Sequence, residues 1–318
     1  MTVLISGRPL RLGSRKSPMA IVQSELVAAL ITERTGRPVE IVGVTTLGDV
    51  SRAQLTQIGG TGVFVSALRE ALLGGEVDLA VHSLKDLPAG AAPGIALAAV
   101  PPRDDPRDAL VARDGAKLAD LPAGARIGTG SPRRAAQLLA LRGDLQTVPI
   151  RGNAGTRLRQ VSDGELDGVV LAAAGLARIG QQHAITQVFE PDEMLPAPGQ
   201  GALAVECRDD DPELAGLLAA VNDEASMAAA VAERSLLEAL AAGCSAPVGG
   251  YAAGTGQLLM RAAVLSPDGT RALRAHGSAP AADARRLGQD LAAELLRRGA
   301  SDFISGPNGP TSSGNDVQ

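Results

Sequence analysis

Short apolar runs alternate with segments of helical spacing through the first third of the chain. The run VDLAVHSL at residues 77–84 is apolar almost throughout, which predicts a mostly buried strand. Ser17 and Pro18 are typical of a helix start, because serine caps free amide groups and proline fits the first helical position. The alternation predicts a parallel βαβαβ unit. Its predicted strands are residues 9–13, 39–45 and 77–84, and its predicted helices are residues 17–30 and 63–73.

A second unit of the same kind follows a stretch that is dense in proline and charge. This stretch, VPPRDDPRD at residues 100–108, predicts a linker. Ser131 and Pro132 then repeat the helix-start pattern behind a strand that ends at residues 126–128. The further elements predicted here are strands at 145–150 and 168–173 and a helix at 154–161. Residues 196–199 (PAPG) predict a second hinge, after which a strand at 201–207 could return to the first unit.

The last third of the chain predicts a third domain of α+β type. A long alanine-rich helix is expected at residues 223–242, ending at Gly243, and a closing helix at 283–298. Three antiparallel strands are expected between them, at 248–252, 258–265 and 271–277. The tail is poor in apolar residues, which predicts disorder. The predicted domains are residues 1–101 with 199–221, residues 102–198, residues 222–305, and a tail at 306–318.

The predicted fold class is therefore α/β, with two hinged βαβ domains and a third α+β domain that holds a small antiparallel sheet. Two crossings between the first two domains would leave a ligand cleft between them. In open parallel sheets, ligands bind beyond the carboxyl ends of the strands. Residues that follow predicted strands are therefore the candidates for chemistry.

Composition narrows the compartment and the class of protein. Apolar residues make up 45% of the 318 residues and aromatic residues only 1%, so aliphatic side chains must fill the cores. No apolar run approaches the roughly 20 residues that cross a bilayer, and the N-terminus does not resemble a secretory signal. The only cysteines, Cys207 and Cys244, are too few for a disulfide scaffold, and the three histidines are too scattered to suggest a metal site. These features predict a cytoplasmic enzyme without a metal.

The charge pattern favours a small polyanion as ligand. The formal net charge is -5, yet almost every basic residue is arginine. Base composition of the genome would explain arginine on exposed helix faces, but not arginine where strands hand over to helices. Arginine presents a planar fork that binds carboxylate or phosphate through two contacts, whereas binding a nucleic-acid duplex needs a broad basic face.

The segment RIGTGSPRRAAQLL at residues 126–139 is the clearest candidate for an anion site. Thr129 and Ser131 lie where a strand leads into a helix N-terminus, whose free amides and dipole favour negative charge. Arg133 and Arg134 are unfavourable beside that dipole unless an anion lies between. An ordinary capped helix with solvated arginines is the alternative. Three further arginines follow predicted strands in the same way: Arg151, Arg157 and Arg178.

The segment VDLAVHSLKDLP places Ser83, Lys85 and Asp86 at the end of an apolar strand. A neighbouring lysine and aspartate could form a surface ion pair of little energetic weight. In a cleft, however, Asp86 could face a cationic intermediate or act as a general acid while Lys85 holds an acidic group. There is no Ser-His-Asp order, no P-loop and no GxGxxG fingerprint, so hydrolase triads, kinases and nicotinamide enzymes are poorly supported.

Cys244 lies in the glycine- and proline-rich loop AGCSAPVGG, whereas Cys207 lies in the apolar strand GALAVEC. A cysteine in a loop is accessible, which makes Cys244 the candidate for covalent chemistry. An unreactive surface thiol is the alternative.

Taken together, these segments resemble the porphobilinogen deaminase family over roughly residues 9–305. Nine blocks occur in the family's order. Each block alone is weak evidence, but nine in the same order do not arise by chance. They are RLGSRKSPMA, GGTGVFVSALREALL, DLAVHSLKDLP, RDDPRDALV, IGTGSPRRAAQL, PIRGNAGTRL, AAAGLARIG, LPAPGQGALAVECR and GCSAPVGG.

The resemblance implies a fold, an activity and a cofactor. Its fold has three domains, the first two like those of type II solute-binding proteins. Its activity joins four porphobilinogen molecules head to tail with release of ammonia, after which water frees hydroxymethylbilane. The family's dipyrromethane cofactor would be bound to Cys244 through a thioether, and Asp86 would be the catalytic carboxylate that stabilises positive charge as ammonia leaves.

The resemblance also implies which residues hold carboxylate side chains, and in what state the protein works. The expected cofactor-binding residues besides Cys244 are Ser83, Lys85, Thr129, Ser131, Arg133 and Arg134, and the expected substrate-binding residues are Arg15, Phe64, Arg151, Arg157 and Arg178. Porphobilinogen would be the small-molecule partner of a cytoplasmic monomer, with neither nucleic acid nor a membrane involved. Because each pyrrole carries two carboxylates, several arginines are needed to balance a growing chain.

Three positions depart from the family pattern. Thr61 and Ser66 stand where some relatives have lysine, which puts a cationic role of that segment in doubt. Phe64 matches, either as a lid over the pyrroles or as part of the core. Ala242 stands where a second glycine is common, a change that we expect the helix end to tolerate.

Two other functions compete with this interpretation. A non-catalytic anion receptor with the same two-domain cleft would explain the arginines but would leave Asp86 and Cys244 without a role. A nucleic-acid-binding regulator would use Arg133, Arg134, Arg157 and Arg159, but the acidic balance and the scarcity of aromatic residues argue against it.

Overall fold

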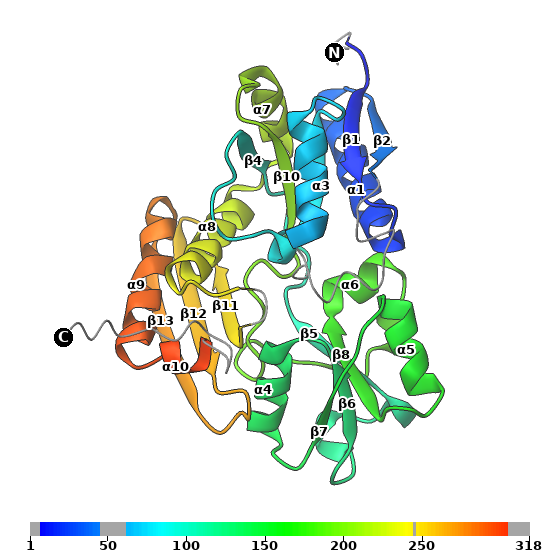
Figure 1. Ribbon diagram of the computed structural model, residues 1–318, viewed down its shortest axis with the longest axis vertical. Coiled ribbons are helices and arrows are strands. Elements are labelled where there is room, and N and C mark those ends of the chain that lie inside the picture. Colours follow the sequence, from blue (N-terminus) through cyan, green and yellow to red (C-terminus); the bar gives the residue numbers. More distant parts are fainter. Residues whose placement is uncertain (1–6, 45–61, 244–245, 305–318) are drawn as a thin grey trace, which may run out of the picture.

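The first sheet combines four strands from residues 10–99 with one strand from residues 203–208. The computed structural model describes residues 7–44, 62–243 and 246–304 (Figure 1). Strands β1, β2 and β3 are parallel, and β10 and β4 complete the sheet in the order β2-β1-β3-β10-β4 with β10 antiparallel to both neighbours. The strands are β1 (Leu10–Ser14), β2 (Val39–Gly43), β3 (Leu79–Ser83), β4 (Ile95–Ala99) and β10 (Leu203–Arg208).

Helices α1 (Pro18–Thr35), α3 (Gly62–Leu73) and α7 (Pro212–Leu218) accompany this sheet. Ser17 caps α1, accepting a hydrogen bond from the Ala20 amide at 3.3 Å, as the Ser-Pro pattern predicts. One core between the sheet and α1 contains Leu12, Ile31 and Val205, all buried. Polar residues stand at the carboxyl ends of two of the sheet's strands, Arg15 after β1 and Ser83 at the end of β3.

The second sheet repeats the strand order of the first. Its order is β7-β6-β8-β5-β9, with β6, β7 and β8 parallel and β5 antiparallel to both neighbours. The strands are β5 (Asp108–Ala112), β6 (Arg126–Thr129), β7 (Gln146–Pro149), β8 (Gly168–Ala172) and β9 (Gln187–Val188). The helices are α4 (Pro132–Leu141), α5 (Ala154–Ser162) and α6 (Ala173–Arg178).

The chain passes between the two sheets twice, through residues 100–107 and through residues 189–202. The two parallel units and the returning strand β10 agree with the sequence prediction. That prediction missed strands β4, β5 and β9. Strand β4 was not predicted, because IALAA is short and follows a glycine- and proline-rich stretch, and residue 108 of the predicted linker begins strand β5.

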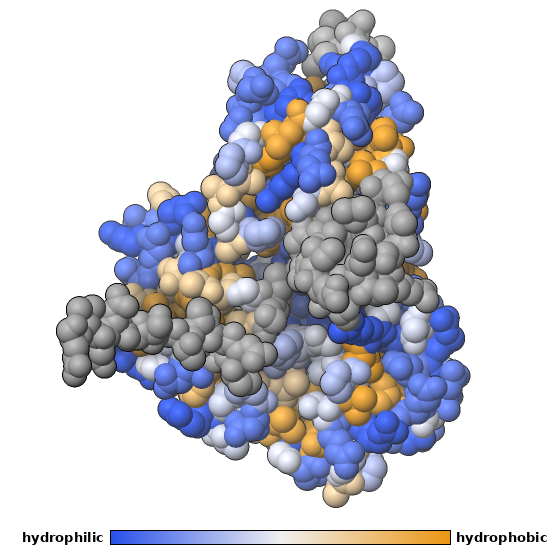
Figure 2. Space-filling model, viewed as in Figure 1, coloured by the Kyte–Doolittle hydropathy of each residue, from blue (hydrophilic) through white to orange (hydrophobic). Residues whose placement is uncertain are grey.

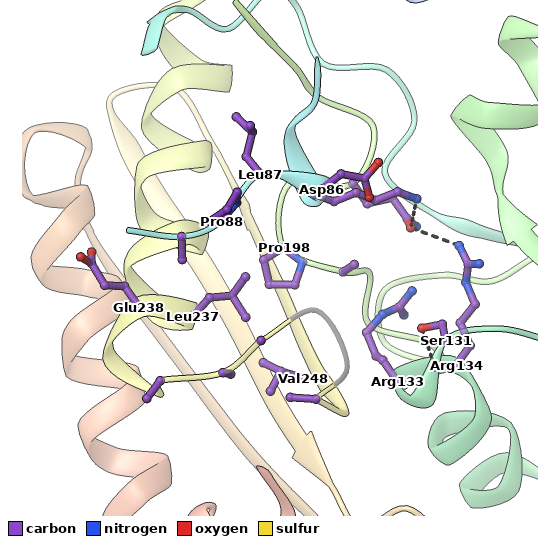
Figure 3. Close-up of a pocket in the computed structure, with 18 of the residues that line it drawn as sticks. Asp86, Leu87, Pro88, Ser131, Arg133, Arg134, Pro198, Leu237, Glu238 and Val248 are labelled. Atoms are coloured by element: carbon purple, nitrogen blue, oxygen red, sulfur yellow. Dashed lines mark hydrogen bonds between the residues drawn. The ribbon is translucent and has the colours of Figure 1, made fainter. Parts of the chain in front are cut away.

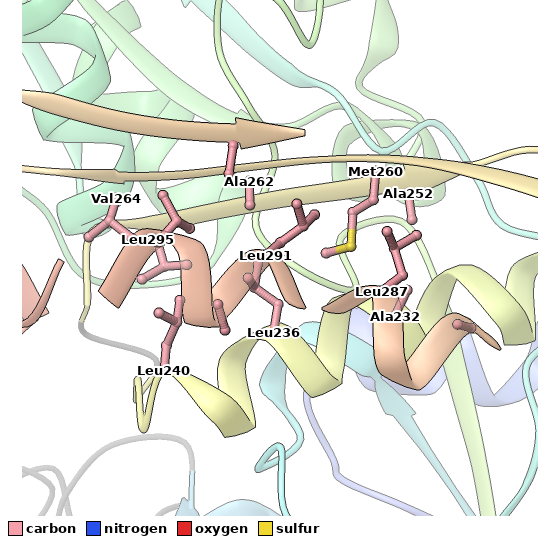
Figure 4. Close-up of a cluster of buried hydrophobic side chains, with 14 of the residues drawn as sticks. Ala232, Leu236, Leu240, Ala252, Met260, Ala262, Val264, Leu287, Leu291 and Leu295 are labelled. Carbon is pink, nitrogen blue, oxygen red and sulfur yellow. The ribbon is translucent and has the colours of Figure 1, made fainter. Parts of the chain in front are cut away.

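A third sheet, β11-β12-β13, is fully antiparallel, as predicted. Its strands are β11 (Val248–Ala253), β12 (Gln257–Leu265) and β13 (Ala272–Pro280). Helices α8 (Glu224–Ala239) and α9 (Ala284–Arg297) pack together on one face, and α10 (Ser301–Ile304) follows α9. Figure 4 shows Leu236, Met260 and Leu291 meeting in the core between these helices and the sheet. The predicted α/β fold class with a third, α+β part is confirmed, while the domain boundaries stay a prediction.

The surface is mostly hydrophilic on the face seen in Figure 2, with apolar residues in separate patches. Within the described residues, no single helix is long and apolar enough to cross a bilayer. By length and composition alone, one pair of helices with a sharp bend between them, Pro212–Val221 and Glu224–Ala239, could do so.

Helix α8 ends earlier than predicted, and its end is strained. The predicted helix ran to residue 242, but Leu240 forms the C-cap and Ala241 takes a left-handed φ of 49°. The amides of Ala241 and Ala242 donate to the carbonyls of Glu238 and Leu237, both at 3.0 Å. This hydrogen-bond pattern usually places glycine at the left-handed position, because a Cβ atom is unfavourable there.

We therefore expect Ala241→Gly to raise the free energy of unfolding by about 0.5–1 kcal/mol, because relief of the strained φ outweighs the added freedom of the unfolded chain. Urea denaturation followed by circular dichroism measures the change. Ala242→Gly is the matched control, since Ala242 has no positive φ and should gain nothing. Equal stabilisation by both substitutions would contradict this explanation.

Candidate active site

A cavity of about 800 Å³ opens where the turn after β3, the start of α4, the second crossing and the end of helix α8 meet. Four segments line it together with Arg157 of α5: residues 85–90 after β3, residues 130–134 at the start of α4, the second crossing at residues 197–200, and residues 237–243 and 246–248 around the end of α8. Figure 3 shows Arg133 and Arg134 on the α4 side, Leu237 and Glu238 on the α8 side, and Asp86 at the edge between them.

Asp86 lies at the carboxyl end of the first sheet. Strand β3 is buried up to His82, and the chain then makes a single 3-10 turn, Leu84–Asp86. Leu84 is buried and its amide donates to the Ala202 carbonyl at 3.0 Å, which fixes the turn against the second crossing. Because the apolar residues of this segment are anchored in this way, the half-buried Asp86 carboxylate is presented to the cavity.

A second, smaller cavity of about 120 Å³ adjoins Asp86 on the α1 side. Arg15, Ser17, Gln23 and Ser83 line it together with Asp86. The Gln23 side-chain amide donates to the Ser83 hydroxyl at 2.8 Å, linking α1 to the end of β3. Asp86 therefore lines both cavities and lies between them, and each cavity has arginine in its wall.

A buried carboxylate organises the two arginines at the start of α4. Asp108 is fully buried, and its oxygens lie 2.7 Å from Arg133 Nη1 and 2.7 Å from Arg134 Nη2. Both guanidinium groups are themselves buried. Burial alone would raise the pKa of Asp108, but the charges of Arg133 and Arg134 outweigh it and hold that pKa well below its usual range. One carboxylate between two guanidinium groups leaves one positive charge for a ligand.

Gln200 joins this cluster to Lys85. Its side-chain oxygen accepts from Arg134 Nη2 at 3.2 Å and from Lys85 Nζ at 3.4 Å, while its Nε2 donates to Asp108 at 2.9 Å. Burial lowers the pKa of Lys85 to about 8, and the nearby charge of Arg134 adds to the effect. Lys85 from the first sheet and Arg134 from the second thus converge on one residue of the second crossing.

Arg157 contributes a further positive charge to the cavity. Its Nε donates to the Gly152 carbonyl at 2.9 Å, and no carboxylate of a described residue lies within ion-pair distance of it. Burial and the charge of Arg134 lower the pKa of Arg157. Four cations, Lys85, Arg133, Arg134 and Arg157, therefore face three carboxylates, Asp86, Asp108 and Glu238, which leaves a net charge of +1 and three guanidinium groups among the cations. Such a site suits a ligand with several carboxylates.

The other predicted site residues fall into three groups. Thr129 and Ser131 shape the turn: the Ser131 amide donates to the Thr129 hydroxyl at 3.2 Å, and the Ser131 hydroxyl caps α4. Arg151 is exposed, and Arg178 binds Asp104 at 2.9 Å and the Gly201 carbonyl at 2.7 Å; neither lines the two cavities.

The side chain of Phe64 and the whole of Cys244 lie outside the described residues. Gly243 and Ala246, the described residues on either side of positions 244 and 245, both line the larger cavity.

Asp108 and Gln200 are the residues that the sequence prediction missed. Asp108 closes the charged stretch VPPRDDPRD, which predicted a linker, and Gln200 follows the PAPG hinge. The available signal was an aspartate directly before the apolar run ALVA, since a charge at the start of a buried strand needs a partner.

Comparison with known proteins places the chain beside one family. The family model described as "Porphobilinogen deaminase, dipyromethane cofactor binding domain" matches residues 10–216, and "Porphobilinogen deaminase, C-terminal domain" matches residues 227–297. Porphobilinogen deaminase of Thermobifida fusca is 56% identical over 95% of this chain and 97% of its own length. Porphobilinogen deaminase 1 of Streptomyces coelicolor is 53% identical over 93% of this chain and 98% of its own.

Among solved structures, a periplasmic substrate-binding protein of an ABC transporter from Coxiella burnetii covers 67% of this chain and 91% of its own. The sequence identity is 19% and the TM-score is 0.42.

The charge of Lys85 should be sensitive to pH in the weakly alkaline range. A pKa of about 8 means that Lys85 loses its proton as pH rises from 7 to 9, so the cavity loses one positive charge. In the Cys244→Ala chain, to which nothing can be attached at that sulfur, we expect a lysine side-chain NMR signal with a midpoint near pH 8. A bound polycarboxylate should move the midpoint upward, because it stabilises the charged form.

The chain has only three lysines, so Lys85→Arg assigns the signal by its disappearance. A Lys85 midpoint at the ordinary value of 10.5 would contradict the buried environment described above.

Proposed function

The chain belongs to the porphobilinogen deaminase family, and we propose that its two cavities carry out that family's reaction. In this reaction four porphobilinogen molecules are joined head to tail, ammonia leaves at each addition, and water releases hydroxymethylbilane. The observation that carries the proposal for the site is that Asp86 lies between two cavities lined by arginine.

The larger cavity fits the family's dipyrromethane cofactor. Its three arginines and Lys85 suit a group with several carboxylates, and Gly243 and Ala246 bring the chain on either side of Cys244 to its wall. When bound, the dipyrromethane supplies the terminal pyrrole carbon to which the next pyrrole is joined. We propose that Cys244 holds it through a thioether and that Lys85, Arg133 and Arg134 hold its acidic side chains, with Ser131 as a polar neighbour that Thr129 positions. Arg157, which the family resemblance assigns to the substrate, faces the same cavity, whereas Ser83 lines the smaller one.

The smaller cavity is the proposed site of the incoming substrate. Arg15 and Ser83 line it and would hold carboxylates of porphobilinogen beside Asp86. The bond between the substrate's methylene carbon and its nitrogen breaks, the electron pair leaves with ammonia, and positive charge spreads over the pyrrole. The Asp86 carboxylate stabilises that charge, because in a partly buried site a fixed negative group interacts more strongly than it would in water.

Arg178 has a different place in this proposal from the one that the sequence suggests. Its guanidinium is bound to Asp104 of the first crossing and to Gly201 of the second. We propose that it reaches substrate carboxylates only when the crossings rearrange, and that exposed Arg151 meets the ligand at the rim. The two sheets would then move about residues 100–107 and 189–202 as the chain grows. We further propose that the protein works as a cytoplasmic monomer.

Asp86→Asn should leave the fold and the attached primer intact but lower kcat by roughly 10²–10³-fold, because an amide cannot offset the developing positive charge. Turnover of porphobilinogen and intact-protein mass, measured on one preparation, report the two effects. Asp209→Asn is the control, since Asp209 is exposed beyond the end of β10 that pairs with the start of β3. Turnover near the unchanged rate in Asp86→Asn would remove Asp86 from the mechanism.

The mass of the purified chain tests the proposed function as a whole. We expect an excess over the sequence mass equal to two condensed pyrrole units, absent from Cys244→Ala and retained in Cys207→Ala, since Cys207 is buried inside β10. Should the chain carry no such excess even after incubation with porphobilinogen, a non-catalytic anion receptor becomes the better explanation.

A further inference from the structure

Helix α8 forms one wall of the larger cavity and leads directly to Cys244. Leu237, Glu238 and Ala241 line that wall, and they lie three, four and seven positions beyond Arg234. This spacing puts Arg234 on the same side of the helix as the cavity wall, about one turn before it. Arg234 itself does not belong to the described lining.

Arg234 binds the segment that carries Asp86. Its Nη2 donates to the Pro88 carbonyl at 2.8 Å and to the Ala89 carbonyl at 3.1 Å, the second and third residues after Asp86. Figure 3 shows Pro88 beside α8, between Leu87 and Leu237. One turn earlier on the helix, Ala230 packs with buried Leu84 and Leu87 of the same segment. The loop after β3 is thus held to α8 by an apolar contact and by a charged donor bound to two successive carbonyls.

The remaining contacts of Arg234 are poor for a residue that serves stability alone. Its Nη1 is buried, and it makes no hydrogen bond to any described residue. Burial lowers the pKa of the guanidinium. A buried donor without a partner destabilises a fold, so a stabilising role does not account for arginine at this position.

We propose that Arg234 is a positioning residue that holds the loop of Asp86 against helix α8 and so fixes the Asp86 carboxylate relative to the α8 wall of the larger cavity. The proposal rests on the function proposed above, in which a pyrrole chain held in that cavity reacts beside Asp86. Each addition then needs the Asp86 carboxylate at a fixed place relative to the bound chain. A displacement of about 1 Å at a reacting centre can lower a rate by roughly 10²-fold.

Three variants test the proposal: Arg234→Met, which removes the donor and keeps most of the stem, Arg234→Lys, and Arg286→Met as the matched control. Arg286 is an exposed arginine on α9 with one loose pairing to Asp283, 3.5 Å away. For each variant we would measure kcat, KM, thermal midpoint and intact mass before and during turnover. Rates are expressed per molecule that carries the two-pyrrole mass.

For Arg234→Met we expect kcat to fall by at least about tenfold while KM changes by less than about twofold. The substitution leaves the substrate cavity unchanged but disturbs the geometry at the reacting centre. Intermediates with one to three added units should accumulate on the protein during turnover. Arg234→Lys should recover most of kcat, since an ammonium group can still donate to the carbonyls. Arg286→Met should match the unchanged chain.

The proposal is overturned if primer-loaded Arg234→Met turns over at the unchanged rate, or if Arg234→Lys is as slow as Arg234→Met. A lower thermal midpoint with an unchanged rate per loaded molecule would likewise show that Arg234 is only structural. Failure of the proposed function is separate, because it would appear as a missing two-pyrrole mass in the unchanged chain.

Discussion

The ion cluster around Asp108 is the interaction on which the site depends. Two adjacent guanidinium groups cannot be buried together without a counter-charge, because each loses its hydration and repels the other. Asp108, with no exposed surface, supplies that charge from the first residue of β5, and Gln200 supplies a further acceptor from the second crossing. The cluster can therefore exist in the folded chain and still present a net positive charge to the cavity.

A second buried carboxylate, that of Glu233, holds the two crossings to the third sheet. Glu233 of α8, also without exposed surface, accepts from Arg103 of the first crossing at 2.6 Å, from the Gly199 amide of the second at 2.5 Å and from the Ala252 amide of β11 at 2.8 Å. Any movement of the sheets about these crossings must rearrange groups next to α8. Helix α8, which leads to Cys244, is thus bound through Glu233 to the crossings that would move. The next residue of the helix, Arg234, is bound to the loop that carries Asp86.

The sequence predicted the parts of the site that depend on local pattern. An apolar strand followed by polar residues located Asp86, and a Ser-Pro pair located the capped start of α4, because both signals act within a few residues. Asp108 was missed because its partners lie 25 and 26 positions away, brought near by an antiparallel strand whose order and direction no local pattern reveals. Arg157 and Arg178 look equivalent in sequence, but only the former faces the cavity, since Asp104 binds the latter.

Arg133 and Arg134 both stabilise the fold through Asp108 and line the cavity, so single substitutions of them cannot separate the two roles. Replacing Arg134 with an apolar residue would leave Asp108 buried with half of its counter-charge, and breaking a buried pair in this way costs about 3–5 kcal/mol. Loss of ligand would then follow from a damaged fold as readily as from a missing contact. Arg157 has no such partner among the described residues and lines the same cavity. A change there alters the charge offered to the ligand while the ion cluster stays intact, so Arg157 separates binding from folding where Arg133 and Arg134 cannot.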